Sequence, residues 1–153
     1  MDINDKKLQV SAIENGTVID HVPASNLFKV IDILGLDKIK SQITFGTNLE
    51  SKRLGNKAII KLADVFFMDE EINKIALVAP EAKLNIIKNY KVVEKKIVEV
   101  PDSIVGIAKC GNPKCVTNIE NIITRFQVVS KKKVALKCHY CEKITDSEHM
   151  EIF

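Results

Sequence analysis

The sequence contains no tryptophan, and its 153 residues include only two tyrosines and six phenylalanines. Proteins that bind single-stranded nucleic acid stack the bases on aromatic side chains, so this composition argues against such a surface. The net charge of +3 is also too small to indicate a surface that binds a phosphate backbone. The composition therefore does not favour a nucleic-acid-binding function.

Long apolar runs are also absent. No run approaches the roughly 18 apolar residues of a membrane-spanning helix, and residues 1–5 are polar, unlike a secretory signal. Hydrophobic residues make up 46% of the chain, which is enough for a core, and charges of both signs are interspersed. We expect a globular cytoplasmic protein.

Cysteine occurs in only one part of the chain. The four cysteines form two close pairs, Cys110 with Cys115 and Cys138 with Cys141, and two turns that each present two thiolates can surround one ion. Zinc prefers four sulfurs in a tetrahedron at about 2.3 Å. Disulfides would need an oxidising compartment, which the polar N-terminus does not indicate, and a redox pair at Cys138 and Cys141 would leave the other two cysteines without a role. We predict one structural zinc ion, whose closed shell of sulfurs leaves no position for a substrate.

Hydrophobic periodicity predicts an α+β fold for the first hundred or so residues. Alternating or short apolar runs predict strands, and apolar residues spaced i, i+3, i+4 and i+7 predict a helix. The predicted strands are residues 8–12, 17–22, 42–46, 57–62, 84–87 and 90–93, and the predicted helices are residues 27–34 and a segment from 69 to Pro80. With the two ranges before the first helix counted as one strand region, and the two after the second helix as another, the order is strand, helix, strand, strand, helix and strand, which fits a ferredoxin-like sheet with two helices on one face.

Pro101 interrupts an apolar run and predicts a boundary between a domain of residues 1–100 and a domain of residues 101–153. In the second domain, residues 122–129 and 134–137 predict a hairpin, with three lysines at its exposed tip. A domain of about fifty residues is near the size at which a metal replaces part of the core. We expect a small all-β zinc-binding domain of the rubredoxin-like or zinc-ribbon kind.

Candidate catalytic groups are few. Asp20 and His21 resemble half of an acid–base pair, but neighbours along a strand point to opposite faces, so the sequence does not predict contact between them. The sequence has neither a Walker-type phosphate loop nor a dinucleotide-binding glycine fingerprint, and nothing resembles an activated serine nucleophile. We therefore expect a chain without enzymatic activity of its own.

Lys57 and Lys61 lie on the predicted outer face of one strand, on either side of Ile59. Lys95 and His21 could join these two lysines if their strands are neighbours. The cations would then surround an apolar platform, an arrangement that suits a nucleoside phosphate. The alternative is that these lysines are solvated or protect a sheet edge from pairing. Spacing alone favours this second interpretation.

Several short motifs occur together in this chain. They are Leu8-Gln9-Val10, Gly16-Thr17-Val18-Ile19-Asp20-His21, Ala79-Pro80, Asn89-Tyr90, the spacing of Cys110 and Cys115, and Leu136-Lys137-Cys138 followed by Tyr140-Cys141-Glu142-Lys143. Together these motifs resemble the regulatory chain of aspartate carbamoyltransferase. The match runs in register from about residue 7 to 143, with one apparent deletion near Lys131. The resemblance implies a non-catalytic chain of pyrimidine biosynthesis, with an allosteric N-terminal domain that binds CTP, UTP or ATP and a zinc domain that docks on the catalytic chain. It also implies regulatory dimers, formed through the N-terminal domains, that hold catalytic trimers together.

The resemblance further implies a nucleotide site, carried over residue by residue. Its members would be Val10, Ser11, Ala12, Ile13, Asp20, His21, Lys57, Lys61, Asn85, Ile87, Tyr90, Val92 and Lys95. Asp20 and Lys61 would face the ribose, with Lys61 also near the base. His21 and Lys95 would face the phosphates.

Recognition of the base would involve backbone groups of Ile13 and Tyr90. Ser11 stands where the best-known members of the family carry a glutamate. A nucleotide that binds more tightly in one quaternary state of the enzyme would shift the whole assembly toward that state.

Contact with the catalytic chain would involve Asn112, Glu142 and Lys143, which match the family, whereas Lys114 replaces a polar amide residue.

Two other functions remain as alternatives. A zinc-ribbon module that binds nucleic acid predicts salt-sensitive association with DNA or RNA. A thiol oxidoreductase requires reactive thiols and no bound metal.

Overall fold

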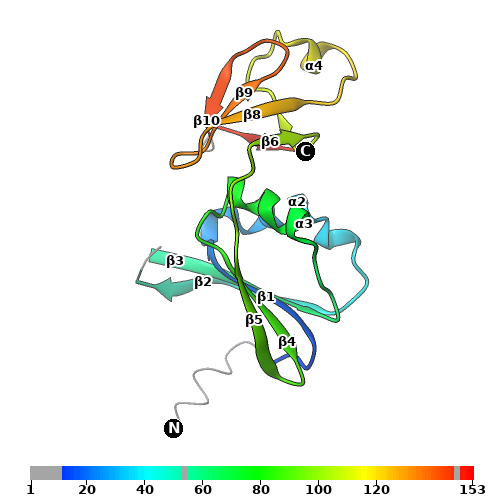
Figure 1. Ribbon diagram of the computed structural model, residues 1–153, viewed down its shortest axis with the longest axis vertical. Coiled ribbons are helices and arrows are strands. Elements are labelled where there is room, and N and C mark those ends of the chain that lie inside the picture. The colour runs from blue at the N-terminus through cyan, green and yellow to red at the C-terminus, as the bar shows by residue number, and fades with distance from the viewer. Residues whose placement is uncertain (1–11, 53–54, 147–148) are drawn as a thin grey trace.

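The computed structural model describes residues 12–52, 55–146 and 149–153 (Figure 1). The predicted strand at residues 8–12 falls almost wholly outside the described residues, as do the predicted nucleotide-site residues Val10 and Ser11. None of the helices in the described part is both long and apolar enough to span a membrane.

Five antiparallel strands form the larger sheet. They are β1 (Gly16–Pro23), β2 (Ile43–Ser51), β3 (Gly55–Ala63), β4 (Lys83–Lys88) and β5 (Lys91–Ile97), in the spatial order β2-β3-β1-β4-β5. Strands β1 to β4 have the arrangement of a ferredoxin-like sheet, which confirms the predicted fold class. The last predicted strand region forms the separate strands β4 and β5 because Asn89 and Tyr90 both have positive φ, 52° and 66°, the backbone of a tight hairpin turn.

Two helices cover one face of this sheet (Figure 1). Helix α2 (Leu27–Leu34) follows the 3₁₀ turn η1 (Ala24–Asn26) and ends at Gly35, whose φ of 63° is the left-handed conformation typical of a helix end. A second 3₁₀ turn, η2 (Leu36–Lys38), comes next. Helix α3 (Asp69–Asn73) continues as the 3₁₀ segment η3 (Lys74–Leu77), so it ends earlier and is less regular than predicted. Three consecutive residues of η3, Ile75 to Leu77, are buried, which the single apolar stripe of an α-helix does not provide.

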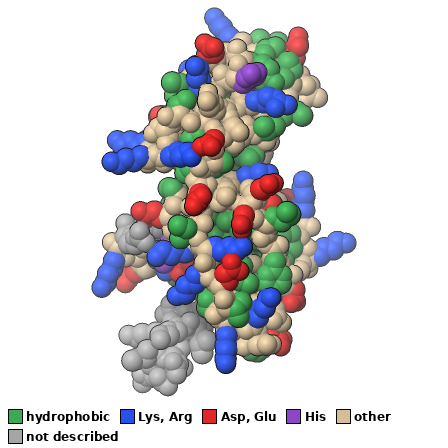
Figure 2. All heavy atoms as spheres, in the orientation of Figure 1, with side chains coloured by type: hydrophobic (Ala, Val, Ile, Leu, Met, Phe, Trp, Pro, Cys, Tyr) green, Lys and Arg blue, Asp and Glu red, His purple; other side chains and the backbone are tan. Residues whose placement is uncertain are grey.

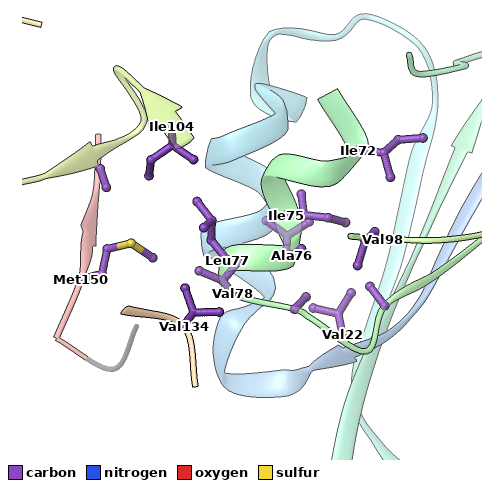
Figure 3. Close-up of a cluster of buried hydrophobic side chains, with 14 of the residues drawn as sticks. Val22, Ile72, Ile75, Ala76, Leu77, Val78, Val98, Ile104, Val134 and Met150 are labelled. Atoms are coloured by element: carbon purple, nitrogen blue, oxygen red, sulfur yellow. The ribbon is translucent and has the colours of Figure 1, made fainter. Parts of the chain in front are cut away.

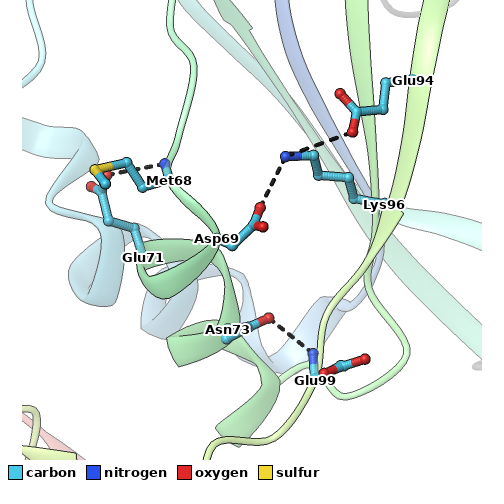
Figure 4. Close-up of polar contacts among 7 residues, drawn as sticks. All are labelled: Met68, Asp69, Glu71, Asn73, Glu94, Lys96 and Glu99. Carbon is cyan, nitrogen blue, oxygen red and sulfur yellow. Dashed lines mark hydrogen bonds and ion pairs between the residues drawn. The ribbon is translucent and has the colours of Figure 1, made fainter.

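Helix α3 is tied to strand β5 and to the segment that follows it (Figure 4). The Nζ atom of Lys96 lies 2.9 Å from Oδ1 of Asp69 and 3.8 Å from Oε1 of Glu94, and the hydrogen bond to Asp69 raises the pKa of Lys96. The side-chain oxygen of Asn73 accepts a 3.1 Å hydrogen bond from the backbone N–H of Glu99. These contacts hold the helix over the edge of the sheet.

Strand register places the core on the side of the sheet that the helices cover. Ile19 pairs with Ile60 of β3 and with Leu84 of β4, and all three side chains are fully buried. Neighbouring residues such as Val18 and Lys61 point to the opposite side, because side chains alternate along a strand. We call this opposite side the open face. It is turned away from the helices and from the C-terminal part of the chain (Figure 1).

The C-terminal part is a small β unit. Its main sheet has the order β10-β9-β8-β6 and consists of β6 (Ser103–Val105), β8 (Arg125–Ser130), β9 (Ala135–Cys138) and β10 (Ile144–Asp146), while β7 (Ala108–Lys109) pairs with β11 (Glu151–Ile152). Strands β8 and β9 form the predicted hairpin. The hairpin begins later than predicted because Thr124 is buried beside β7, where its hydroxyl donates to the carbonyl of Ala108 at 2.7 Å. The short helix α4 (Val116–Ile119) was not predicted.

The two parts of the chain pack together through apolar side chains. Leu77 and Val78 lie opposite Ile104, Val134 and Met150 of the C-terminal unit, and each of the five is at most 5% exposed (Figure 3). One buried cluster therefore continues across the predicted domain boundary, with the helices between the open face and the C-terminal unit. Figure 2 shows acidic and basic side chains interspersed over the surface of both parts.

Candidate functional site

The side chains of Cys110, Cys115, Cys138 and Cys141 meet within the C-terminal unit, as predicted. Their four Sγ atoms lie within 4.8 Å of one another, with 3.6 Å between Cys110 and Cys141 and 3.7 Å between Cys115 and Cys138. A disulfide would place two sulfurs about 2.05 Å apart, so these are free thiols. A tetrahedron of sulfurs about 2.3 Å from a central ion has edges of about 3.8 Å. The four sulfurs therefore fit a bound metal ion.

The first cysteine turn is held by Asn118, a residue that sequence reasoning missed. Its Nδ2 donates to the carbonyl oxygen of Cys110 at 2.9 Å and to that of Asn112 at 2.7 Å. The backbone N–H of Cys115 also donates to the carbonyl of Asn112, at 3.0 Å. The short helix α4 thus presents Asn118 to the loop between the two cysteines. The only signal in the sequence was an amide side chain shortly after the second cysteine.

The second cysteine turn is closed by backbone hydrogen bonds. The N–H of Glu142, which has a φ of 64°, donates to the carbonyl of Cys138 at 3.0 Å, and the N–H of Cys138 donates to the carbonyl of Lys143 at 3.0 Å. The first turn approaches this region closely, because a Cβ at Gly111 would lie 2.8 Å from Oγ1 of Thr145. The loops that carry the four sulfurs are therefore packed against each other.

The electrostatics of the four thiols differ with burial and with the hydrogen bonds that reach each sulfur. Burial raises the pKa of Cys110 to about 12 and also raises the pKa of Cys138. Burial acts in the same direction on Cys141, but hydrogen bonds from the backbone of Lys143 and the side chain of Asn112 outweigh it, and the pKa falls to about 7. Buried thiols are costly to ionise side by side. A coordinated cation is what allows such a group of sulfurs to be thiolates together.

Strand register gathers several predicted nucleotide-site residues in one row on the open face. Lys61 of β3 pairs with Val18 of β1, Val18 pairs with Asn85 of β4, and Asn85 pairs with Lys95 of β5. Directly opposed side chains in antiparallel strands share a face, with Cβ atoms about 4.5–5.5 Å apart. The row therefore runs across four strands, with a lysine at each end.

A β-bulge brings Asp20 and His21 together, which corrects the prediction that their side chains point apart. The register of β1 and β3 shifts between Ile19 and Val22, and His21 has a φ of 60°. The backbone N–H of His21 donates to Oδ1 of Asp20 at 2.7 Å, and Nδ1 of His21 lies 3.4 Å from Oδ2, an ion-pair distance without hydrogen-bond alignment. Lys57 Nζ lies 3.0 Å from Oδ1 of the same carboxylate. Strand alternation fails here because the bulge adds one residue to β1.

Three lysines, Lys57, Lys61 and Lys95, lie on the open face in or beside this row. Partial burial lowers the pKa of Lys61, while the carboxylate of Asp20 acts in the opposite direction. These three lysines share the surface with the carboxylate of Asp20 and the imidazole ring of His21. A surface of this kind attracts anions.

A hollow of about 230 Å³ adjoins one end of the row. Its lining includes the predicted site residues Ala12 and Ile13, together with Gln42 and Thr44, which sequence reasoning missed. Thr44 of β2 pairs directly with Lys61, so the hollow lies next to the Lys61 end of the row. No pattern in the sequence distinguished Gln42 or Thr44 from other polar residues of a strand.

The remaining predicted site residues lie near the β4–β5 hairpin. Ile87 is buried, whereas Tyr90 and Val92 are exposed. The backbone N–H of Tyr90 donates to the carbonyl of Glu14 at 2.9 Å, which joins the hairpin to the segment that carries Ala12 and Ile13.

The predicted contacts with a partner chain lie on the two cysteine turns. Asn112 is on the first turn, and Glu142 and Lys143 are on the second. A groove of about 450 Å³ beside the second turn includes Glu142 in its lining, together with Arg125 and His139, which sequence reasoning did not select. The turns that hold the sulfurs therefore also present polar side chains at the surface.

Comparison with known proteins assigns the family. Residues 8–99 match the model for "Aspartate carbamoyltransferase regulatory chain, allosteric domain", and residues 102–151 match that for "Aspartate carbamoyltransferase regulatory chain, metal binding domain". The aspartate carbamoyltransferase regulatory chain of Bacteroides thetaiotaomicron is 55% identical over 152 residues, which cover 99% of both chains. That of Pyrococcus horikoshii is 53% identical over 146 residues, 94% of this chain and 96% of the relative. The chain therefore belongs to the family of aspartate carbamoyltransferase regulatory chains, the non-catalytic subunits of this enzyme of pyrimidine biosynthesis.

Proposed function

We propose that the open face binds the nucleotide effectors CTP, UTP and ATP, and that their binding controls the catalytic chain. The observation that carries this proposal is the row of Lys61, Val18, Asn85 and Lys95 across four strands, with Asp20 and its two basic neighbours beside it. Apolar and amide groups in the middle of the row suit a nucleoside, and lysines suit phosphate oxygens as point charges.

The nucleotide lies along the open face with its base toward the hollow. Backbone groups of Ile13 and Tyr90 bind the edge of the base there, since the hollow, the Glu14 carbonyl and the β4–β5 hairpin adjoin one another. Asp20 and Lys61 hold the ribose. At the other end, His21 and Lys95 bind the phosphates.

The four cysteines hold one zinc ion. An all-thiolate set with sulfur separations near those of a regular tetrahedron supports zinc over the harder cations, which prefer oxygen ligands. The bound ion supplies a cross-link between the two cysteine turns. Asn118 orients the first turn, and the backbone bonds of Glu142 and Lys143 orient the second.

Control passes from the nucleotide domain, residues 1–100, to the zinc domain, residues 101–153. As a member of its family, the chain has the catalytic chain as its partner. The zinc domain docks on the catalytic trimers through Asn112, Glu142 and Lys143, and the nucleotide domains pair two regulatory chains. The buried cluster between the domains supports transmission, because Leu77 and Val78 cannot move without the side chains that they contact. A coupling free energy of about 1–3 kcal/mol would change substrate affinity about 5- to 150-fold.

Calorimetric titration of the purified chain with CTP and with ATP tests the proposal. The chain should bind both nucleotides, and Lys95→Ala should weaken binding, because one phosphate contact is lost. Lys91→Ala is the matched control, since Lys91 is an exposed lysine of the same strand outside the row. Negligible heats for the unmodified chain would reject the nucleotide site.

A further inference from the structure

Strand β4 begins with a lysine that lies on the open face and that the nucleotide site described above does not include. Lys83 pairs with Asp20 of β1 on one side and with Ile97 of β5 on the other. The next residue, Leu84, is fully buried on the helix side, so Lys83 and Asn85 share the open face. Lys83 itself is exposed.

The position of β4 in the sheet makes Lys83 relevant to phosphate binding. The two proposed phosphate contacts, His21 and Lys95, come from β1 and β5, the strands that flank β4. Neighbouring strands lie about 4.8 Å apart, so a phosphate chain that contacts both residues must cross β4. It does so at the end of β4 that pairs with Asp20, where Lys83 projects.

Charge pairing leaves Lys83 available for an anion. The carboxylate of Asp20 lies directly across from it, but that carboxylate is bound by Lys57 at 3.0 Å and forms no ion pair with Lys83. Among the ion pairs of the described residues, none involves Lys83 or Lys95. Two lysines without an ion pair therefore stand on adjacent strands, at diagonal positions of the pairing pattern, where residues are about 7–8 Å apart and their Cβ atoms somewhat closer.

We propose that Lys83 is a further phosphate-binding residue of the nucleotide site, and that it increases the preference for nucleoside triphosphates over nucleosides. This inference rests on the proposed function of the open face. A lysine is suited to the role because its ammonium group is a compact charge on a flexible stem, which can follow the phosphate chain across β4.

Binding of CTP and of cytidine to Lys83→Met tests this role. With the full chain at low ionic strength, Lys83→Met should weaken CTP binding about 5-fold, as expected for one partly exposed charge-assisted contact, and should leave cytidine binding within about 2-fold. Lys83→Arg should restore most of the CTP affinity, because it keeps the charge. Lys88→Met, at the other end of β4, is the matched control and should bind CTP as the unmodified chain does.

The possible results separate this inference from the function on which it rests. If Lys83→Met binds CTP as tightly as the unmodified chain while Lys95→Ala does not, Lys83 is merely solvated and the nucleotide site stands without it. An equal loss for CTP and cytidine would also reject a phosphate contact. If the unmodified chain binds neither ligand, both the site and the role of Lys83 are rejected. Thermal melting of each variant, with Lys83→Gln as a second neutral substitution, distinguishes lost binding from lost folding.

Discussion

Gly16, the first residue of strand β1, has no room for a side chain. Its φ is +142°, a conformation that residues with a Cβ rarely adopt. A Cβ at this position would overlap the carbonyl oxygen of Leu62 and would lie 3.0 Å from the backbone nitrogen of Asp64. Both are backbone atoms, so no change of side-chain rotamer relieves the overlap. Gly16→Ala is therefore expected to destabilise the sheet at the end of β1 that borders the hollow.

The size of the effect follows from two terms. The unfavourable backbone conformation costs about 1–3 kcal/mol. Relief of the overlap requires β1 and β3 to separate near the pair of Gly16 and Ala63, which loses about one backbone hydrogen bond, or about 1 kcal/mol. The sum of about 2–4 kcal/mol is a large part of the 5–15 kcal/mol or so that stabilises a typical domain. For a chain of this length it lowers Tm by about 4–16 °C.

Thermal melting of Gly16→Ala beside Gly55→Ala provides the measurement and its control. Gly55 also has a positive φ, +77°, but a Cβ there would meet no atom within 4 Å. Gly55→Ala therefore reports the conformational term alone, about 1–2 kcal/mol. Equal decreases in Tm for the two variants would show that the close approach of Gly16 to β3 contributes nothing, and would refute the reasoning.

Three further predictions concern the metal centre and the contact between the two parts of the chain. Removal of the metal by a chelator, or Cys141→Ser, should release the catalytic trimers, because the cysteine turns lose their cross-link; metal analysis with analytical ultracentrifugation tests this, and an intact complex after verified metal loss would contradict it. Asn118→Ala should lower zinc affinity about 10- to 100-fold, because the first turn loses two hydrogen bonds to carbonyl groups. Competition with a chromogenic chelator measures the affinity, and Asn121→Ala is the control, because Asn121 is an exposed amide outside the two cysteine turns. Leu77→Ala should lower the free energy of unfolding by about 2–5 kcal/mol, because the side chain is 1% exposed, and urea denaturation measures this loss. The same substitution should weaken the effect of CTP on the catalytic chain more than it weakens CTP binding, which activity assays of the assembly and calorimetry compare; an unchanged CTP response would exclude the buried cluster from transmission.

The metal centre and much of the secondary structure could be predicted from local patterns. The spacing of the four cysteines predicted their meeting, because a short turn presents both of its thiolates whatever surrounds it. The periodicity of residues 27–34 matched helix α2, whose bounds are Leu27–Leu34, and the alternation of Ala58, Ile60 and Leu62 identified the buried side of β3. These signals depend only on residues close in the sequence. Alternation along the same strand also predicted that Lys61 lies on the outer side, and in the structure Lys61 lies on the open face, where it pairs with Val18.

Other features depended on neighbours that lie far away in the sequence. The contact between Asp20 and His21 arises from a bulge in the pairing of β1 with β3, and strand alternation by itself predicts the opposite. The place of Lys83 between the two proposed phosphate contacts follows from the order of strands in the sheet, because β4 lies between β1 and β5 only in the folded chain. Residue types and spacing by themselves determined which chemical groups the protein has and which short segments are regular. The tertiary structure alone decided which of those groups share a surface, because strand order and register are set by packing of the whole sheet.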